Sequence, residues 1–171
     1  MTVNNKLFFI HGQAGSGQGF KATYLRGLYP DLLAPDFPGD FWERMAQLSR
    51  LLAETTGWTL IGSSMGGLMA AVFACQHPGQ VERLVLLAPA LPYIDLAENP
   101  LPPIDLPVTI IHGGQDDIVP IDKTRIVAEQ IFTNLTFMTF DASHDLNPIM
   151  PQLDWPELIA KPGGRSQSEL L

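Results

Sequence analysis

Short apolar runs alternate with helical patterns along most of the chain. The run Leu7–Ile10 is continuous and apolar, as in a strand that a parallel sheet buries on both faces. A glycine-rich loop follows at residues 12–19. The clearest helical pattern, at residues 41–56, has apolar side chains at helical spacing behind the capping pair Asp40 and Glu43. This alternation predicts an α/β fold in which helices flank a mostly parallel sheet.

The same analysis places the remaining elements. Residues 89–106 hold five prolines, which indicate an ordered crossover loop and no long helix. Residues 1–160 are expected to form one domain, and the polar residues 161–171 a flexible C-terminal tail. The patterns predict strands at residues 7–10, 31–35, 58–61, 81–88, 107–111 and 135–140, and helices at residues 20–28, 41–56, 68–77, 122–132 and 147–160, the last broken by prolines.

Composition supports a single domain with a real core. Of the 171 residues, 46% are hydrophobic and 16% are charged, which excludes an intrinsically disordered chain. The 18 acidic residues outnumber the 10 basic ones, giving a net charge of −8. Because an acidic surface repels phosphate backbones and anionic headgroups, neither nucleic acid nor a membrane is an expected partner. The single cysteine, Cys75, lies in an apolar stretch typical of the core.

Neither the start of the chain nor its most apolar helical stretch has the features of a targeting or membrane segment. Met1–Ile10 carries one lysine and an apolar run too short for a secretory signal. Gly66–Cys75 is too short to cross a bilayer. The expected location is therefore the cytoplasm.

The strongest local signal is the G-x-S-x-G motif at Gly62–Gly66, between a predicted strand and a predicted helix. A nucleophilic serine must stand clear of the sheet on a sharp turn, and small residues on both sides prevent clashes there. The register names Ser64 as the nucleophile and not Ser63. A plain glycine-rich turn between strand and helix is the competing interpretation. A serine hydroxyl is a weak nucleophile alone, so a base is required.

The base should be a histidine after a later strand. His144 directly follows the strand predicted at residues 135–140. His11 and His112 precede glycines at strand ends and are expected to shape loops, and His77 lies at a helix end. Only His144 has both the chain order and the position that the chemistry requires.

A third group must orient the imidazole and stabilise its charged form. Asp116 follows the strand at residues 107–111 and is the preferred candidate. Its neighbour Asp117 reads equally as a surface acid, and Asp141 lies too close to the histidine in sequence. Asp95, in the proline-rich crossover, remains an alternative.

An oxyanion hole needs two backbone donors aimed at the developing charge. One should be the N–H of Met65, after the nucleophile, and the other the N–H of Gln13, in the loop after the first strand. That glycine-rich loop is a poor nucleotide site. A dinucleotide motif would need glycine at Phe20, and a phosphate-binding loop would need lysine at Gln18.

In the joint order of these motifs, the chain resembles the α/β-hydrolase superfamily over nearly its whole length up to Ala160. Within that superfamily it is most similar to the small, cap-less bacterial serine esterases. The family has the order nucleophile, acid, base found in Ser64, Asp116 and His144. The resemblance implies a Ser-His-Asp triad with no metal and no organic cofactor. It rests on Phe9-Ile10-His11-Gly12, Phe20-Lys21-Ala22-Thr23, Asp36-Phe37-Pro38-Gly39, Gly62-Ser63-Ser64-Met65-Gly66-Gly67, Arg83–Pro89, Ile111-His112-Gly113, Asp116, Val119-Pro120 and His144.

The chain departs from larger family members where they insert a helical lid, since residues 89–106 are proline-rich. The site should therefore be open and lined by residues such as Leu91, Tyr93 and Ile94. The resemblance implies hydrolysis of a small carboxylic ester or thioester by a monomer or homodimer. A cofactor-free perhydrolase using the same triad, or a non-catalytic binding or scaffold protein on this fold, is the alternative.

Overall fold

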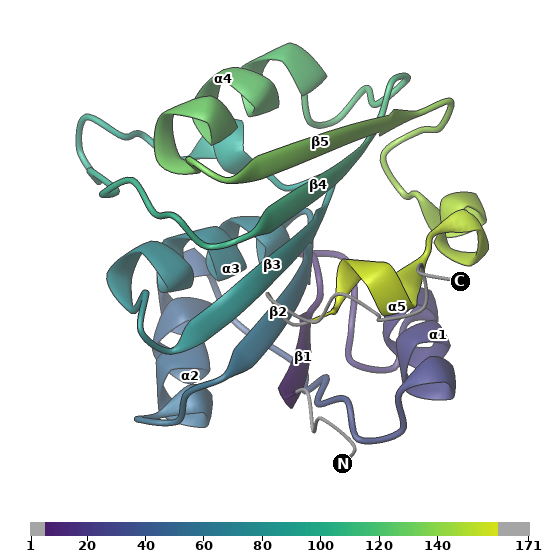
Figure 1. Cartoon of the computed structure of the whole chain (residues 1–171), viewed down its shortest axis with the longest axis horizontal. Coiled ribbons are helices and arrows are strands. Elements are labelled where there is room, and N and C mark those ends of the chain that lie inside the picture. The colour runs from purple at the N-terminus through teal and green to yellow at the C-terminus, as the bar shows by residue number, and fades with distance from the viewer. Residues whose placement is uncertain (1–5, 161–171) are drawn as a thin grey trace, which may run out of the picture.

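The computed structural model describes residues 6–160 (Figure 1). Within that range, five parallel strands form one twisted sheet in the order β1-β2-β3-β4-β5. The expected tail at residues 161–171 lies outside the described residues. The strands are β1 (Lys6–Ile10), β2 (Trp58–Ser63), β3 (Val81–Leu87), β4 (Val108–Gly113) and β5 (Leu135–Phe140).

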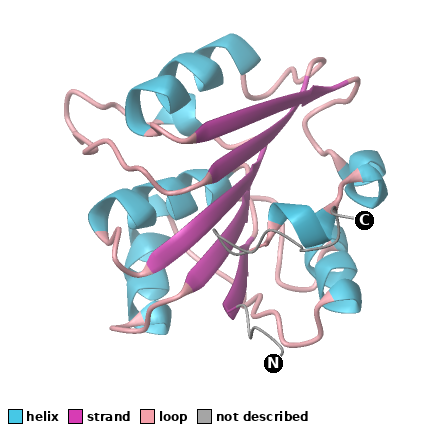
Figure 2. Ribbon diagram, viewed as in Figure 1, coloured by secondary structure: helices cyan, strands magenta, loops and turns pink. Residues whose placement is uncertain are grey.

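Helices cover both faces of the sheet, as Figure 2 shows. One face carries α2 (Phe41–Leu52), α3 (Met65–Gln76) and α4 (Ile121–Ile131). The other face carries α1 (Phe20–Leu28), the 3-10 helix η2 (Asn147–Gln152) and the short helix α5 (Trp155–Leu158). The sequence prediction of a parallel sheet flanked by helices is confirmed.

The sheet separates two hydrophobic cores. Phe8 and Ile10 of β1 belong to the core under α2 and α3, whereas Leu7 and Phe9 belong to the core under α1 and α5. Successive side chains of a strand point to opposite faces, so each strand contributes to both cores. This explains why the strands read as continuous apolar runs.

Several predicted elements differ from the structure in type or in bounds. The helix expected at residues 41–56 ends at Leu52, because Ala53 has φ 45°, which leaves the helical region. The strand expected at residues 31–35 is reduced to one bridge, in which Leu33 accepts from Phe9 N–H at 2.8 Å and donates to Leu7 O at 3.0 Å. Pro30 and Pro35 flank this bridge, and their missing N–H groups prevent a longer ladder. The last helix is two short helices, η2 and α5, interrupted by prolines as expected.

The segment between β3 and β4 is fully described and holds a single helix, the 3-10 helix η1 (Leu91–Tyr93). The proline-rich crossover is therefore a loop, as predicted. None of the helices in residues 6–160 is long and apolar enough to cross a bilayer.

The turn from β2 into α3 is the tightest junction in the fold. A Cβ on Gly66 would overlap the carbonyl of Ile10, and one on Gly62 would overlap the carbonyl of Gly66. Between these glycines Ser64 has φ 54° and ψ −117°, a conformation that non-glycine residues rarely adopt. The helix begins at Met65, three residues before the predicted start, so Ser64 lies directly at its N-terminus.

Replacing Gly66 by alanine should therefore lower the free energy of unfolding by about 3 kcal/mol, because the backbone of β1 cannot move away from the new methyl group. Urea unfolding at pH 7 measures the loss. The matched control is Gly27→Ala in α1, where an added Cβ meets no atom within 4 Å. That variant should be unchanged or stabilised by up to about 1 kcal/mol. Equal stability of both variants would contradict the close packing at the turn.

Candidate active site

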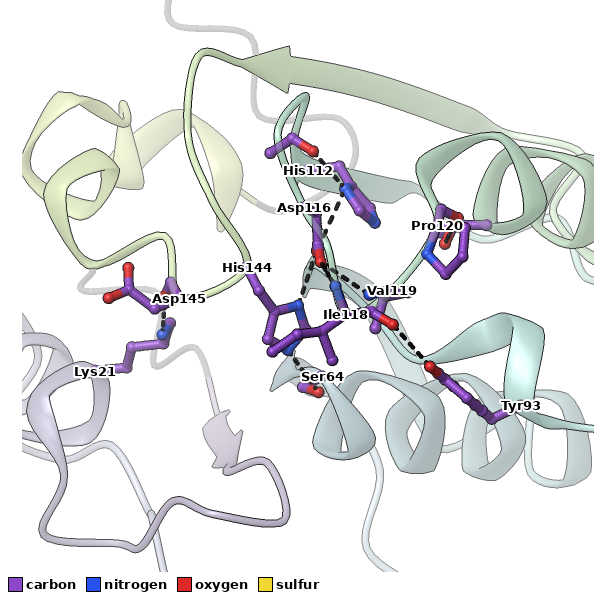
Figure 3. A network of polar contacts seen from close by, with 12 residues as sticks. Lys21, Ser64, Tyr93, His112, Asp116, Ile118, Val119, Pro120, His144 and Asp145 are labelled. Atoms are coloured by element: carbon purple, nitrogen blue, oxygen red, sulfur yellow. Dashed lines mark hydrogen bonds and ion pairs between the residues drawn. The ribbon is translucent and has the colours of Figure 1, made fainter.

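Three segments bring the predicted triad residues together at the carboxyl edge of the sheet (Figure 3). Ser64 follows β2, Asp116 lies in the loop after β4, and His144 lies in the loop after β5. Ligands of open parallel sheets bind at this edge, where the loops after neighbouring strands converge. The sheet order places β2, β4 and β5 close enough for the three side chains to meet.

A chain of two hydrogen bonds joins the three side chains. The Nε2 atom of His144 lies 3.0 Å from Ser64 Oγ, and its Nδ1 atom lies 2.8 Å from Asp116 Oδ2. An ionised carboxylate only accepts, so Nδ1 carries the proton and donates it to Asp116. Nε2 then accepts from the serine hydroxyl. This tautomer is the one that can take a proton from Ser64.

The backbone of Ser64 is held from several sides. Its N–H donates to Leu87 O at 2.9 Å, and its carbonyl accepts from the N–H groups of Gly67, Leu68 and Ala90. These bonds to β3, α3 and the start of η1 stabilise the strained backbone. Although Ser64 is the N-cap of α3, its side chain makes no capping bond, and its Oγ is free to face His144.

The side chain of Asp116 is buried, and both its oxygens have hydrogen-bond partners. Its Oδ1 accepts from the N–H groups of Ile118 at 2.9 Å and Val119 at 2.8 Å, while Oδ2 faces His144. Burial acts to raise the pKa of Asp116. The hydrogen bonds from Val119, His144 and Ile118 outweigh burial and hold this pKa below its ordinary value, so the carboxyl is ionised.

The competing acids lie elsewhere. Asp141 accepts from Gln115 Nε2 at 2.5 Å, and Asp95 accepts from Ala97 N–H at 2.8 Å within its own turn. Neither contacts His144. Of the carboxylates weighed from the sequence, Asp116 is the one that the structure brings to the imidazole.

The two expected oxyanion donors flank Ser64. Met65 is the first residue of α3, so its N–H has no acceptor within the helix. Gln13 follows Gly12, where an added Cβ would lie 3.2 Å from Ser64 Cβ. Among residues 6–160, no acceptor is found for either N–H. Both residues line the cavity beside Ser64.

The other buried histidines shape loops. His11 lies 2.6 Å from Gly12 O through Nδ1 and accepts from Phe37 N–H at 2.9 Å through Nε2. His112 is fully buried, with Nδ1 3.8 Å from Asp116 Oδ2. Burial is the main cause that lowers the pKa of His112, so its ring is neutral beside Asp116.

Two cavities meet at Ser64. Both have mostly apolar walls: the first is about 600 Å³, and the second is about 430 Å³ and includes His144. Gln13, Ser64 and Ile118 line both cavities. The first is lined by Phe41, Trp42, Met65, Leu68, Ile94 and Val119, among others, and the second by Gly15, Ser16, Lys21, Asp145 and Asn147, among others.

The predicted lining residues fall in two groups. Tyr93 and Ile94 line the first cavity, and the Tyr93 hydroxyl donates to Ile118 O at 2.7 Å across its mouth. The expectation for Leu91 is wrong, because the tight turn of η1 directs this side chain into the core, where it is 0% exposed. Sequence reasoning missed Trp42, an exposed aromatic side chain at the start of α2, outside the apolar stripe of that helix.

A lysine on the wall of the second cavity connects two segments of the chain. Lys21 of α1 donates to the carbonyl of Asp145 and to Asn147 Oδ1, so it ties α1 to the loop that carries His144 (Figure 3). Burial lowers the pKa of Lys21, with Asp145 opposing that effect. No group of three or more His, Cys, Asp or Glu side chains in the described part of the chain could hold a metal ion.

Comparisons with known proteins agree on the fold. A family model described as the alpha/beta hydrolase fold matches residues 13–103, just over half of the 171-residue chain. The chain therefore belongs to the α/β-hydrolase fold family. A search of curated proteins finds no match.

Solved structures of this fold resemble the chain at low identity. Mouse alpha/beta hydrolase domain-containing protein 10 has a TM-score of 0.72 at 17% identity, covering 84% of this chain and 83% of that one. A monoacylglycerol lipase from Paleococcus ferrophilus has a TM-score of 0.65 at 19% identity, covering 81% and 85%. The thioesterase domain from the curacin biosynthetic pathway has a TM-score of 0.67 at 15% identity, covering 87% and 88%. At these identities the likeness is one of fold.

The ionised state of Asp116 predicts a pH-dependent contribution to stability. Asp116→Asn keeps an oxygen that can accept from Ile118 and Val119 but turns an NH₂ group toward Nδ1 of His144. The free energy of unfolding of this variant should be lower than that of the wild type by about 1–3 kcal/mol at pH 7. The native pKa lies below the unfolded value, so the carboxylate stabilises the fold above about pH 4 and this effect is lost as pH falls through the native pKa. Urea unfolding at pH 7 and pH 3 measures both.

Asp117→Asn is the matched control, because this neighbouring side chain is exposed. It should change stability by less than about 0.5 kcal/mol at either pH. A loss in Asp116→Asn that is the same at pH 7 and pH 3 would contradict an ionised, hydrogen-bonded Asp116.

Proposed function

We propose that the protein is a serine hydrolase that cleaves small carboxylic esters or thioesters through an acyl-enzyme. The observation that carries the proposal is the hydrogen-bond chain from Ser64 Oγ through His144 to Asp116 Oδ2, at 3.0 Å and 2.8 Å. The chain ends at a serine that lines both cavities. A nucleophile, a base and an orienting acid in hydrogen-bond contact are the requirements for acyl transfer through serine.

In the first half of the reaction, Ser64 Oγ attacks the carbonyl carbon of the ester. His144 Nε2 takes the hydroxyl proton as the new C–O bond forms, and the carbonyl electron pair moves to its oxygen. The imidazolium that results is stabilised by Asp116, whose pKa is already held low. When the tetrahedral intermediate collapses, His144 returns the proton to the leaving alcohol or thiol.

In the second half, water replaces the leaving group. His144 removes a proton from water, whose oxygen attacks the acyl carbon, and the proton passes back to Ser64 Oγ as the acid departs. The N–H groups of Met65 and Gln13 donate to the oxyanion in both halves. They need no reorganisation as charge develops, because α3 and the loop after β1 hold them in place.

The two cavities divide the substrate. Because His144 protonates the leaving group, that group must lie on the His144 side, in the cavity of about 430 Å³. The acyl group then occupies the cavity of about 600 Å³ between α2 and η1, whose walls include Phe41, Leu68 and Ile94. Apolar walls suit a hydrocarbon acyl group. The second cavity has mostly apolar walls too, but Lys21 and Asn147 on its wall offer polar groups to the leaving alcohol or thiol.

A fluorophosphonate tests the nucleophile directly. It should phosphonylate Ser64 Oγ with loss of fluoride, and mass spectrometry of the digested protein locates the adduct. Ser64→Ala should prevent labelling and lower kcat for a 4-nitrophenyl ester by about 10⁴-fold or more. Ser63→Ala, one residue away, should still be labelled at Ser64. An unlabelled wild-type protein that is folded by circular dichroism would overturn the proposal.

The acyl assignment predicts a steric change in specificity. Ile94→Trp places a larger side chain in the first cavity, so kcat/KM for a hexanoyl ester should fall by about 10-fold relative to the acetyl ester. Ile126→Trp, at an exposed position on α4, is the control and should leave the ratio unchanged. If Ile94→Trp instead altered the dependence on the alcohol group, the two cavities would have the opposite roles.

A further inference from the structure

We propose that Arg44 of α2 is a positioning residue that aims the Gln13 N–H at the oxyanion. The inference rests on the proposed function, because only acyl transfer places an oxyanion beside Ser64. Arg44 is not in contact with the three triad side chains and would act through the peptide that it holds.

The guanidinium of Arg44 is buried against the loop after β1. It donates through Nε to Gly39 O at 3.0 Å, through one terminal nitrogen to Gly12 O at 3.4 Å, and through the other to Gln13 O at 3.5 Å. The residue is only 6% exposed. Three backbone carbonyls from two loops therefore converge on one cation.

No ion pair within residues 6–160 involves Arg44. A buried charge without a carboxylate must be solvated by dipoles, because desolvation of an isolated ion costs a large free energy. Backbone carbonyls are the available dipoles here. The charge consequently favours the loop conformation in which Gly12 O and Gln13 O point toward it.

Because the peptide is planar, a fixed direction of the Gly12 carbonyl also fixes the direction of the Gln13 N–H. Gly12 C=O and Gln13 N–H belong to the same peptide unit, and none of the peptide bonds in the described range is cis. In a trans peptide the C=O and the N–H point in opposite directions. A carbonyl held toward Arg44 therefore forces the Gln13 N–H away from Arg44.

This peptide lies beside Ser64, and a Gln13 N–H turned away from Arg44 would be a donor to an oxyanion there. An added Cβ on Gly12 would lie 3.2 Å from Ser64 Cβ and 3.9 Å from Ser64 Oγ, and Gln13 lines the cavity at Ser64. His11 Nδ1 also contacts Gly12 O, at 2.6 Å, so the imidazole and the guanidinium contact the same carbonyl. Donors on a carbonyl polarise its peptide and strengthen the N–H as a donor.

The effect should fall on kcat. Negative charge on the carbonyl oxygen is large in the transition state and small in the bound ester, so a better-aimed donor stabilises the transition state more. Arg44→Met should lower kcat by about 10- to 100-fold with KM within about 2-fold, since removing one oxyanion donor costs about 10²- to 10³-fold. Arg44→Lys keeps the charge and should recover part of the loss.

The experiment follows hydrolysis of 4-nitrophenyl acetate, with kcat and KM determined separately, and the affinity for a trifluoromethyl ketone, which forms an oxyanion on Ser64. The ketone affinity should fall in parallel with kcat/KM in both Arg44 variants. Arg50→Met, an exposed arginine of the same helix, is the matched control and should change neither. Unchanged kcat in Arg44→Met, or a rise in KM alone, would overturn the proposal.

A second readout does not depend on catalysis. In the free protein, the ¹⁵N order parameter of the Gln13 amide should be about 0.85 in the wild type and fall below about 0.6 in Arg44→Met. If Arg44→Met does not fold, Arg44→Lys provides the same comparison with a smaller change. A Gln13 amide that stays rigid in the variants would overturn the positioning role. Absence of turnover and of labelling in the wild type would instead overturn the proposed function. Because the order parameter is measured without catalysis, it separates that outcome from a failure of the positioning role.

Discussion

The close approach of three backbones at the turn after β2 is the constraint on which the rest of the site depends. Side chains are excluded at Gly62 and Gly66, so β1, β2 and the start of α3 can pack directly on one another. The strained Ser64 backbone between them is then held by bonds to Leu87 and Ala90. One residue thus links the central strand, the long helix and the crossover loop. Because these bonds fix the backbone of Ser64, they also fix the direction of its side chain, which projects from the edge of the sheet where the two cavities meet.

Much of this arrangement could be predicted from the sequence, because its signals are local. Buried parallel strands give continuous apolar runs, and the motif around Ser64 requires glycines at fixed offsets. His144 and Asp116 follow predicted strands, and parallel strands end at a common edge. Chain order and strand ends were therefore enough to select these residues. The capping pair at Asp40 marked the start of α2 for the same reason, since both its bonds lie within four residues.

The features that escaped prediction depend on contacts between distant segments. Arg44 has the appearance of an ordinary polar position on an amphipathic helix, and only the fold brings it to the carbonyls of Gly12 and Gln13, more than 30 positions away. The sequence predicts Leu91 at the site because the proline-rich crossover as a whole is predicted to line it. The 3-10 turn instead directs the Leu91 side chain into the core. Trp42 gave no signal because its exposure is decided by where α2 lies on the sheet.

The two backbone hydrogen bonds of Ile118 link the size of the first cavity to the position of Asp116. Its N–H donates to Asp116 Oδ1, and its carbonyl accepts from the Tyr93 hydroxyl at 2.7 Å. A single residue therefore joins the crossover loop to the acid that orients His144. An acyl group large enough to push Tyr93 aside would pull on the same peptide that holds Asp116. In the proposed reaction, cavity width and imidazole alignment would then depend on the same residue, so oversized substrates would be disfavoured by misalignment as well as by steric exclusion.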